Sequence, residues 1–148
     1  MKKSTIIIKE DCLDDAILVS QQIPEFENAY SKREYKNRLQ DVKHLVLTAY
    51  LNNTPVGFKI GYETPTKQNF YSWMGAVLPK YRQLGIAEKL LEYQVQRAIK
   101  TGYLRILVKT RRKHKAMIKL LHTHGFLKIG TIHYNADGET RLLYEKKL

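Results

Sequence analysis

A switch from strand to helix periodicity between residues 69 and 101 constrains the fold of this chain more than any other feature. The segment 69–79, NFYSWMGAVLP, is rich in aromatic and apolar residues and ends at a proline, so it predicts a β-strand. From Ala87 onward, apolar residues recur at steps of three and four, which predicts an amphipathic helix that ends at Gly102 in a left-handed turn. A further strand is predicted at 104–110, LRILVKT. This order predicts a crossover connection within a mixed α/β sheet.

The segment before this unit predicts a strand and two short helices. Residues 5–10, TIIIKE, are typical of a strand, and a helix is predicted from near Asp14 to a point before Pro24, because proline disfavours helix at the residue that precedes it. Ser31 and Glu34 have the spacing of a capping box, so a second helix is predicted to begin after Ser31.

Residues 44–51 and 56–63 predict a β-hairpin around the turn residues NNTP. In the second strand the apolar side chains alternate with a second set that consists of Gly57, Lys59, Gly61 and Glu63. We therefore expect a half-buried hairpin, with one face of the strand against the core and the other toward solvent.

The end of the chain predicts a shorter helix that stops at Gly125 and a last hairpin formed by 127–135 and 141–147 across the turn ADG. No repeat, low-complexity tract or linker interrupts the 148 residues. We therefore expect a single α/β domain over 1–148 with a mixed sheet.

The charge balance favours an anionic ligand. The chain carries 26 Lys and Arg against 14 Asp and Glu, which gives a net charge of +12. From Tyr93 to Ala136 there is no acidic residue at all, although this stretch is rich in Lys and Arg. Such a block indicates either a localised anion site or a solvated basic surface.

Cys12 is the sole cysteine, so an intrachain disulfide is impossible and a cysteine-based metal site is not expected. The five histidines show no helical spacing of three or four, and we expect no metal site. The first residues, MKKSTIIIKEDCLDD, lack the long apolar run of a signal peptide or a membrane span. A cytoplasmic protein without membrane association is expected.

The stretch 82–87, RQLGIA, lies at the predicted junction between strand and helix. Free backbone N–H groups and the positive end of the helix dipole make such a junction a site for phosphate. Gly85 has no Cβ and lets a ligand approach the backbone, and Ala87 keeps the first turn open for the same reason. The stretch is neither a P-loop nor a three-glycine Rossmann loop.

This stretch resembles the Gln/Arg-x-x-Gly-x-Gly/Ala pattern of the Gcn5-related N-acetyltransferase (GNAT) superfamily, and the chain is similar to its small bacterial members. The resemblance extends to the preceding strand ending in AVLPKY, the long helix, the strand LRILVKT and a helix closing in HGF. It implies the GNAT fold, which is a mixed, mostly antiparallel central sheet flanked by about four helices, and acetyl-CoA as cosubstrate.

The resemblance also implies which residues contact the cofactor. The backbone N–H of Val77 is implied to polarise the acetyl carbonyl. In the family the loop amides hold the pyrophosphate of coenzyme A and the preceding strand binds the pantetheine arm. The corresponding residues here are Val77, Leu78, Arg82, Gln83, Leu84, Gly85, Ile86, Ala87 and Glu88.

The last helix departs from the family pattern. The family has an Asn that contacts the cofactor and, seven residues later, a Tyr that protonates the thiolate; the matching positions hold His114 and Leu121. No tyrosine is supplied, so the general acid has no candidate here. His122 and His124 are expected at the surface or in packing rather than in catalysis. A CoA-binding protein that has lost catalysis therefore stays open as an alternative.

An acceptor ammonium must lose a proton before it attacks, so a carboxylate is expected near the acetyl carbon. Glu63 at the end of a strand is the candidate base, with Glu25 and Glu27 as further possibilities.

By strand alternation Tyr71 and Trp73 share a side with Gly75 and Val77. These two aromatic residues either line an acceptor pocket or belong to the core.

We expect an acetyltransferase that moves an acetyl group directly from acetyl-CoA to a primary amine of a small molecule or a protein. The alternative from another class is a nucleic-acid-binding module that uses KTRRKHK at 109–115 as a phosphate-contacting strip. That strip lacks a recognition motif, so no specific nucleic-acid partner is expected. The oligomeric state stays open, with a homodimer among the possibilities.

Overall fold

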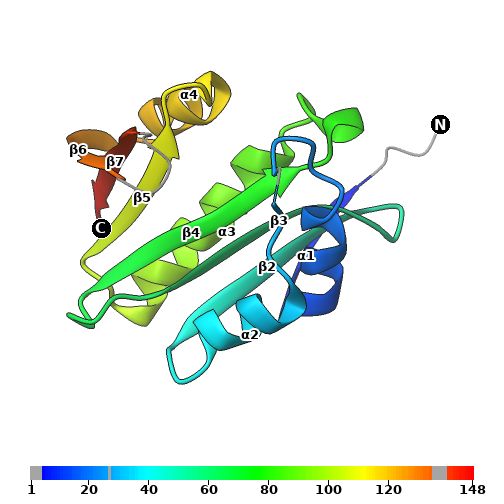
Figure 1. The fold of residues 1–148 in the computed structure, drawn as a ribbon, viewed down its shortest axis with the longest axis horizontal. Coiled ribbons are helices and arrows are strands. Elements are labelled where there is room, and N and C mark those ends of the chain that lie inside the picture. The colour runs from blue at the N-terminus through cyan, green and yellow to red at the C-terminus, as the bar shows by residue number, and fades with distance from the viewer. Residues whose placement is uncertain (1–4, 27, 135–139) are drawn as a thin grey trace.

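The computed structural model describes residues 5–26, 28–134 and 140–148. A single seven-stranded sheet with the order β1-β2-β3-β4-β5-β7-β6 organises them (Figure 1). The elements follow one another as β1 (Ile6–Glu10), α1 (Leu13–Ser20), α2 (Lys32–Leu39), β2 (His44–Leu51), β3 (Thr54–Glu63), β4 (Asn69–Val77), the 3₁₀ turn Pro79–Tyr81, α3 (Ile86–Thr101), β5 (Arg105–Arg111), α4 (Lys115–Thr123), β6 (Leu127–His133) and β7 (Thr140–Lys147). The predicted order of strands and helices and the predicted α/β class are confirmed.

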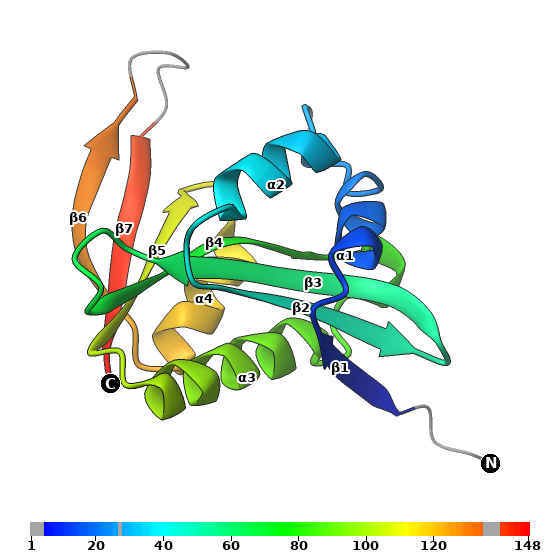
Figure 2. The ribbon, with the colours of Figure 1, turned by 90° about the horizontal axis from the view of Figure 1, so that it is seen from below.

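Helices cover both faces of the sheet. Figure 2 shows α1 and α2 on one side of β2–β4 and α3 on the other. Two buried clusters match this layering: one gathers side chains from α1, α2, β2 and β3, and the other joins α3 and α4 to β2–β5 and β7. The predicted capping box of α2 is present, since Glu34 N–H donates to Ser31 Oγ and Ser31 N–H donates to Glu34 Oε1.

The expectation of a half-buried hairpin is wrong. Residues 45–50 of β2 and 56–61 of β3 are buried throughout, because α1 and α3 pack against opposite faces of these strands. Lys59, which alternation assigned to the solvent side, is only 5% exposed. Gly57 allows this close cover: a Cβ there would lie 3.2 Å from Cγ2 of Ile86 in α3.

The strand β4 contains a β-bulge that changes its alternation. Ile60 pairs with Met74 and Gly61 pairs with Ser72, which leaves Trp73 as the extra residue. Tyr71 and Trp73 contact the aromatic side chain of Tyr62 on the α1/α2 face. Val77 instead packs in the α3 cluster. The expectation that Tyr71 and Trp73 share a side with Gly75 and Val77 is therefore wrong, because simple alternation does not hold across a bulge.

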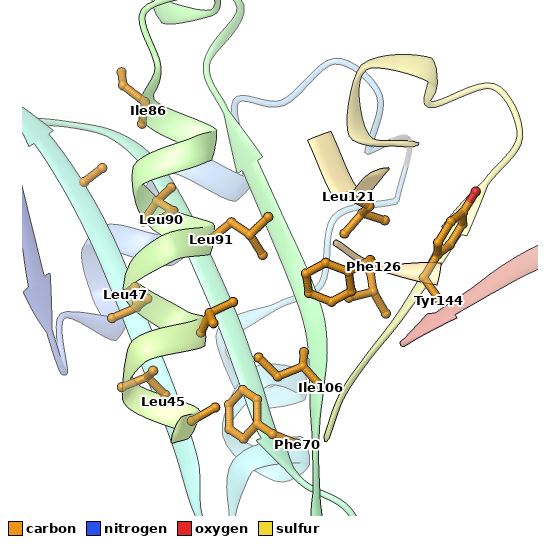
Figure 3. Close-up of a cluster of buried hydrophobic side chains, with 14 of the residues drawn as sticks. Leu45, Leu47, Phe70, Ile86, Leu90, Leu91, Ile106, Leu121, Phe126 and Tyr144 are labelled. Carbon is orange, nitrogen blue, oxygen red and sulfur yellow. The ribbon is translucent and has the colours of Figure 1, made fainter. Parts of the chain in front are cut away.

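The α3 cluster forms the larger core (Figure 3). Leu90 and Leu91 of α3 face the sheet, while Leu121 and Phe126 close the core beyond β4. Among the described residues, no helix is long and apolar enough to cross a membrane.

Candidate functional site

The C-terminal half of β4 has one unpaired edge. The parallel pairing of β4 with β5 covers only Asn69–Ser72, opposite Arg105–Val108. Leu78 N–H donates to the carbonyl of Val56 at 2.9 Å, on the β3 side. Since successive N–H groups of a strand point in opposite directions, the N–H groups of Val77 and Gly75 face the gap between β4 and β5.

The loop from Pro79 to Gly85 carries this edge into α3. Gln83 (φ 65°) and Gly85 (φ 82°) both have left-handed backbone conformations, and Gly85 is the N-cap of α3 without a side-chain cap. Within the described part of the chain, no backbone N–H from Gln83 to Glu88 donates to another backbone group, and the first such bond runs from Lys89 to the carbonyl of Gly85. These amides lie at the positive end of α3, where free N–H groups have the geometry that suits an anion.

The surface above Gly85 is open. A Cβ built on this glycine has no atom within 4 Å among the described residues, whereas the side chain of the next residue, Ile86, is buried against Gly57. The helix start is therefore fixed on its inner side and accessible on its outer side. A glycine also suits the positive φ that most residues avoid.

Arg82 fastens the loop to the segment between α1 and α2. Its Nε donates to the carbonyl of Val77 at 3.0 Å, and its two terminal nitrogens donate to the carboxylate of Glu25 at 2.8 and 3.0 Å. This hydrogen-bonded pair is the main cause of the lowered pKa of Glu25, and His114 lowers it slightly further. The side chain of Arg82 is thus engaged by groups of the protein itself. The free donors of this loop are its backbone amides.

The structure brings most of the predicted cofactor residues to one place. Val77, Leu78 and residues 82–88 form a continuous run from the unpaired edge of β4 to the start of α3. His114 is the N-cap of α4 and is close enough to Glu25 to affect its pKa. The bidentate pair of Arg82 and Glu25 was not expected from the sequence, because the two residues lie 57 positions apart.

Glu63 is not brought to this site. It pairs with Phe70 across β3 and β4, seven residues along β4 from Val77, since 77 − 70 = 7. Its carboxylate accepts a hydrogen bond from Tyr103 Oη at 3.0 Å at the other end of the sheet. We therefore withdraw Glu63 as the candidate base. Of the other two carboxylates, Glu25 is held by Arg82 with a lowered pKa, which makes it a weak base, and Glu27 lies outside the described residues.

Leu121 is fully buried in the core, so its position offers no proton donor. His122 lies against the ring of Tyr144, with 3.4 Å between its Nε2 and Tyr144 Oη, and His124 pairs with Glu88 at 3.0 Å. These contacts support packing roles for both histidines.

A wall of aromatic rings lies on the opposite face of the sheet from α3. Trp73 contacts Tyr30, Tyr35 and Tyr62 with ring centroids 5.4–5.9 Å apart, and Tyr71 contacts Tyr62 edge to face at 5.4 Å. The guanidinium of Arg38 stacks on Trp73 at 4.6 Å. Burial raises the pKa of Tyr71, which keeps its hydroxyl protonated.

Glu88, Glu92 and His124 place potential metal-ligand atoms within 4.8 Å of one another. Both glutamates are exposed, and exposed acidic groups of this kind are common without an ion. Within this group His124 Nε2 lies 3.0 Å from Glu88 Oε1, and this contact joins α3 to the end of α4.

Several cations of the basic block have partners inside the protein. Arg97 pairs with Glu10 at 3.1 Å, and Arg105 lies 3.6 Å from Glu145. Lys109 donates to Tyr134 Oη and lies 5.2 Å from the ring centre of Tyr71. Of these three residues only Lys109 belongs to the predicted strip at 109–115, and its contacts with Tyr134 and Tyr71 give it a role within the fold.

Comparisons with known proteins agree with this fold. The model of the acetyltransferase (GNAT) family matches residues 15–126. No curated protein matches the sequence. The ribosomal-protein-S18-alanine N-acetyltransferase from Escherichia coli has a similar structure, with a TM-score of 0.80 and 21% identity over 98% of this chain and 94% of that one. Ard1 from Thermoplasma volcanium has a TM-score of 0.82 and 14% identity over 97% of each chain. A GNAT family acetyltransferase from Elizabethkingia anophelis with acetyl-CoA bound has a TM-score of 0.77 and 17% identity over 99% of this chain and 100% of that one.

Proposed function

Because this chain belongs to the acetyltransferase (GNAT) family, we propose that it transfers an acetyl group from acetyl-CoA to a primary amine of a small molecule or a protein. The observation that carries this proposal is the continuity between the unpaired edge of β4 and the free amides at the start of α3. We assign the whole chain, 1–148, to one catalytic domain.

The residues present fit acetyl-CoA. Amides from Gln83 to Glu88 would hold the pyrophosphate, and the open space above Gly85 would admit it. The edge of β4 at Val77 and Leu78 would lie along the pantetheine arm, with His114 on the other side of the gap. When bound, acetyl-CoA supplies an acyl group already activated as a thioester.

The Val77 N–H would stabilise the negative charge that develops on the acetyl oxygen. A fixed backbone donor of this kind contributes roughly 3 kcal/mol to the transition state. Leu121 supplies no proton donor, so we propose that the thiolate takes its proton from water or from the reacting amine.

We propose that the acceptor amine enters from the aromatic wall. Tyr71 and Trp73 would line its approach to the C-terminal half of β4. The transfer is proposed to be direct, without an acetyl-enzyme intermediate. Cys12, the sole thiol, lies before α1, where its Sγ contacts the carbonyl of Glu10 at 3.6 Å, outside the elements that form the site.

Release of free coenzyme A from acetyl-CoA tests the proposal. A panel of amines, polyamines, aminoglycosides and peptides should contain at least one acceptor that stimulates release, and Cys12→Ala should retain that turnover. Calorimetry on the same protein separates the alternatives. Binding of acetyl-CoA without turnover on any acceptor would indicate a CoA-binding protein without catalysis, and absence of binding would contradict the proposal entirely.

A further inference from the structure

Two buried polar side chains lie in the apolar layer between α3 and the sheet. Gln94 of α3 is fully buried, and neither its Nε2 nor its Oε1 has a hydrogen-bond partner within the described residues. Lys59 of β3 is 5% exposed. Burial alone lowers its pKa to about 8, with no charged partner contributing.

Lys59 extends toward the unpaired half of β4. It pairs with Gly75, and a Cβ on Gly75 would lie 3.3 Å from Cγ of Lys59 and 3.5 Å from its Nζ. The lysine side chain therefore occupies the space that the glycine leaves free. Its amine ends beside the part of β4 whose backbone faces the gap.

Gln94 reaches the same layer from the helix. The side chain of Ile86 in α3 packs over Gly57 of β3. Both α3 and β3 run antiparallel to β4, so α3 and β3 run in the same direction (Figure 1). Eight residues of helix advance about 12 Å. The same distance on a strand is between three and four residues, at about 3.3 Å each. By this spacing Gln94 is level with residues 60–61 of β3, one step along the strand from Lys59, where the ring of Phe70 covers Gly61.

Buried polar groups without partners destabilise a fold, and native proteins rarely keep them without a reason. Apolar residues at both positions would pack against the leucines of α3 at no such cost. One such group on Gln94, together with a buried lysine whose amine ends beside the same stretch of β4, points to a polar ligand.

We propose that Lys59 and Gln94 form a polar lining on the α3 side of β4 that positions the pantetheine arm of acyl-CoA. In the bound state Lys59 donates one hydrogen bond to a carbonyl oxygen of the arm and a second to Oε1 of Gln94. This inference rests on the proposed function. It assigns the two residues a positioning role, because the amides of the loop and the edge of β4 contact the rest of the cofactor.

Calorimetry with two ligands tests the proposal. Coenzyme A contains the arm, whereas adenosine 3′,5′-bisphosphate lacks it and reaches only the loop. Lys59→Met and Gln94→Leu should each weaken coenzyme A binding about tenfold, equivalent to about 1.4 kcal/mol. Both should leave the affinity for the bisphosphate unchanged. The melting temperature of either variant without ligand should rise, because a buried polar side chain is removed from the core.

Leu90→Met is the matched control, since it changes the same layer without changing polarity or volume. It should leave both affinities unchanged. The NMR resonance of Nζ of Lys59 in the wild-type protein should shift on addition of coenzyme A and stay in place with the bisphosphate.

Unchanged coenzyme A affinity in both variants would overturn the inference and leave the proposed function intact. An equal loss for both ligands would also overturn it, because that pattern reports a distorted fold. Wild-type protein that binds neither ligand would refute the proposed function and the inference together.

Discussion

The two halves of β4 differ although they belong to one strand. Asn69–Ser72 pairs with β3 on one edge and with β5 on the other, so its backbone groups are used within the sheet. Beyond the bulge at Trp73, the strand keeps β3 as a partner and loses β5. The first half is paired on both edges, whereas the second half keeps backbone donors that no neighbouring strand uses.

The proposed site is therefore built mainly from backbone groups, without a cluster of reactive side chains. The amides at the unpaired edge and in the following loop are fixed by the sheet, by the Arg82–Glu25 pair and by the burial of Ile86. Donors that are held in place before binding need little reorganisation when a ligand arrives. The corresponding cost in stability is the loss of hydrogen bonds along the part of β4 that does not pair with β5.

The largest effect is expected from Gly85→Asp, which tests whether the unpaired half and its loop act as one anion site. The substitution places a negative charge and a Cβ at a backbone with φ 82°. Acetyl-CoA affinity should fall at least 100-fold, about 2.7 kcal/mol, as measured by calorimetry.

Gly102→Asp is the control for this variant. Gly102 has φ 98° and open space around its Cβ position, but it ends α3 instead of beginning it. The control should lose stability and keep its acetyl-CoA affinity. Equal losses of affinity in the two variants would contradict the assignment of an anion site to the loop at Gly85.

Proline substitutions distinguish the two edges of β4. Val77→Pro removes an N–H that faces the gap, so turnover should fall about 100-fold while the fold persists. Ala76→Pro removes an N–H that faces β3 and should destabilise the sheet by more than about 2 kcal/mol. Turnover assays and thermal unfolding measure the two effects. If Val77→Pro retains full turnover in folded protein, Val77 is not the donor.

The pH dependence of stability tests whether Lys59, which lies beside the unpaired half of β4, is buried as the structure shows. The pKa of Lys59 is lowered from 10.5 to about 8 in the folded protein. Between these values the unfolded chain binds more protons than the folded one, so the free energy of unfolding contributed by this group rises as the pH increases. The gain from pH 7 to pH 10 should be on the order of 2 kcal/mol.

The free energy of unfolding, measured with urea for the wild type and Lys59→Met at pH 7 and pH 10, isolates the contribution of Lys59 to this rise. The difference between the two proteins should change with pH by that amount, because all other titrations are shared. A constant difference would mean that Lys59 keeps its ordinary pKa.

The smallest effect is expected from replacing both His122 and His124 with glutamine. These residues lie on the far side of the gap from β4, in contact with Tyr144 and Glu88. Turnover should stay within about twofold, and its rise with alkaline pH should persist, because the amine must be deprotonated. A large loss in folded protein would identify one of them as the missing acid.

Local patterns in the sequence predicted much of the fold. The capping box at Ser31 and Glu34, the helix from Ala87 to Gly102 and the glycine at the start of that helix all depend on residues a few positions apart. Such features follow from backbone geometry and spacing, which a single sequence displays. The resemblance to the GNAT family, now confirmed, had the same local basis in RQLGIA and its flanking strand and helix.

What only the tertiary structure decided depends on residues far apart in the chain. The bulge at Trp73 arises from the register of β4 against β3, and it moves Tyr71 and Trp73 to the face opposite Val77. Lys59 is buried because α3 covers the face that alternation assigned to solvent. In the sequence this cover was indicated only by Gly57 and Gly61, which have no side chain on that face. Glu63 lies away from the candidate site and contacts Tyr103, whereas Glu25 lies beside it because it pairs with Arg82. Sequence spacing determines which way a side chain points from its own element, whereas the packing of other elements determines what that side chain meets.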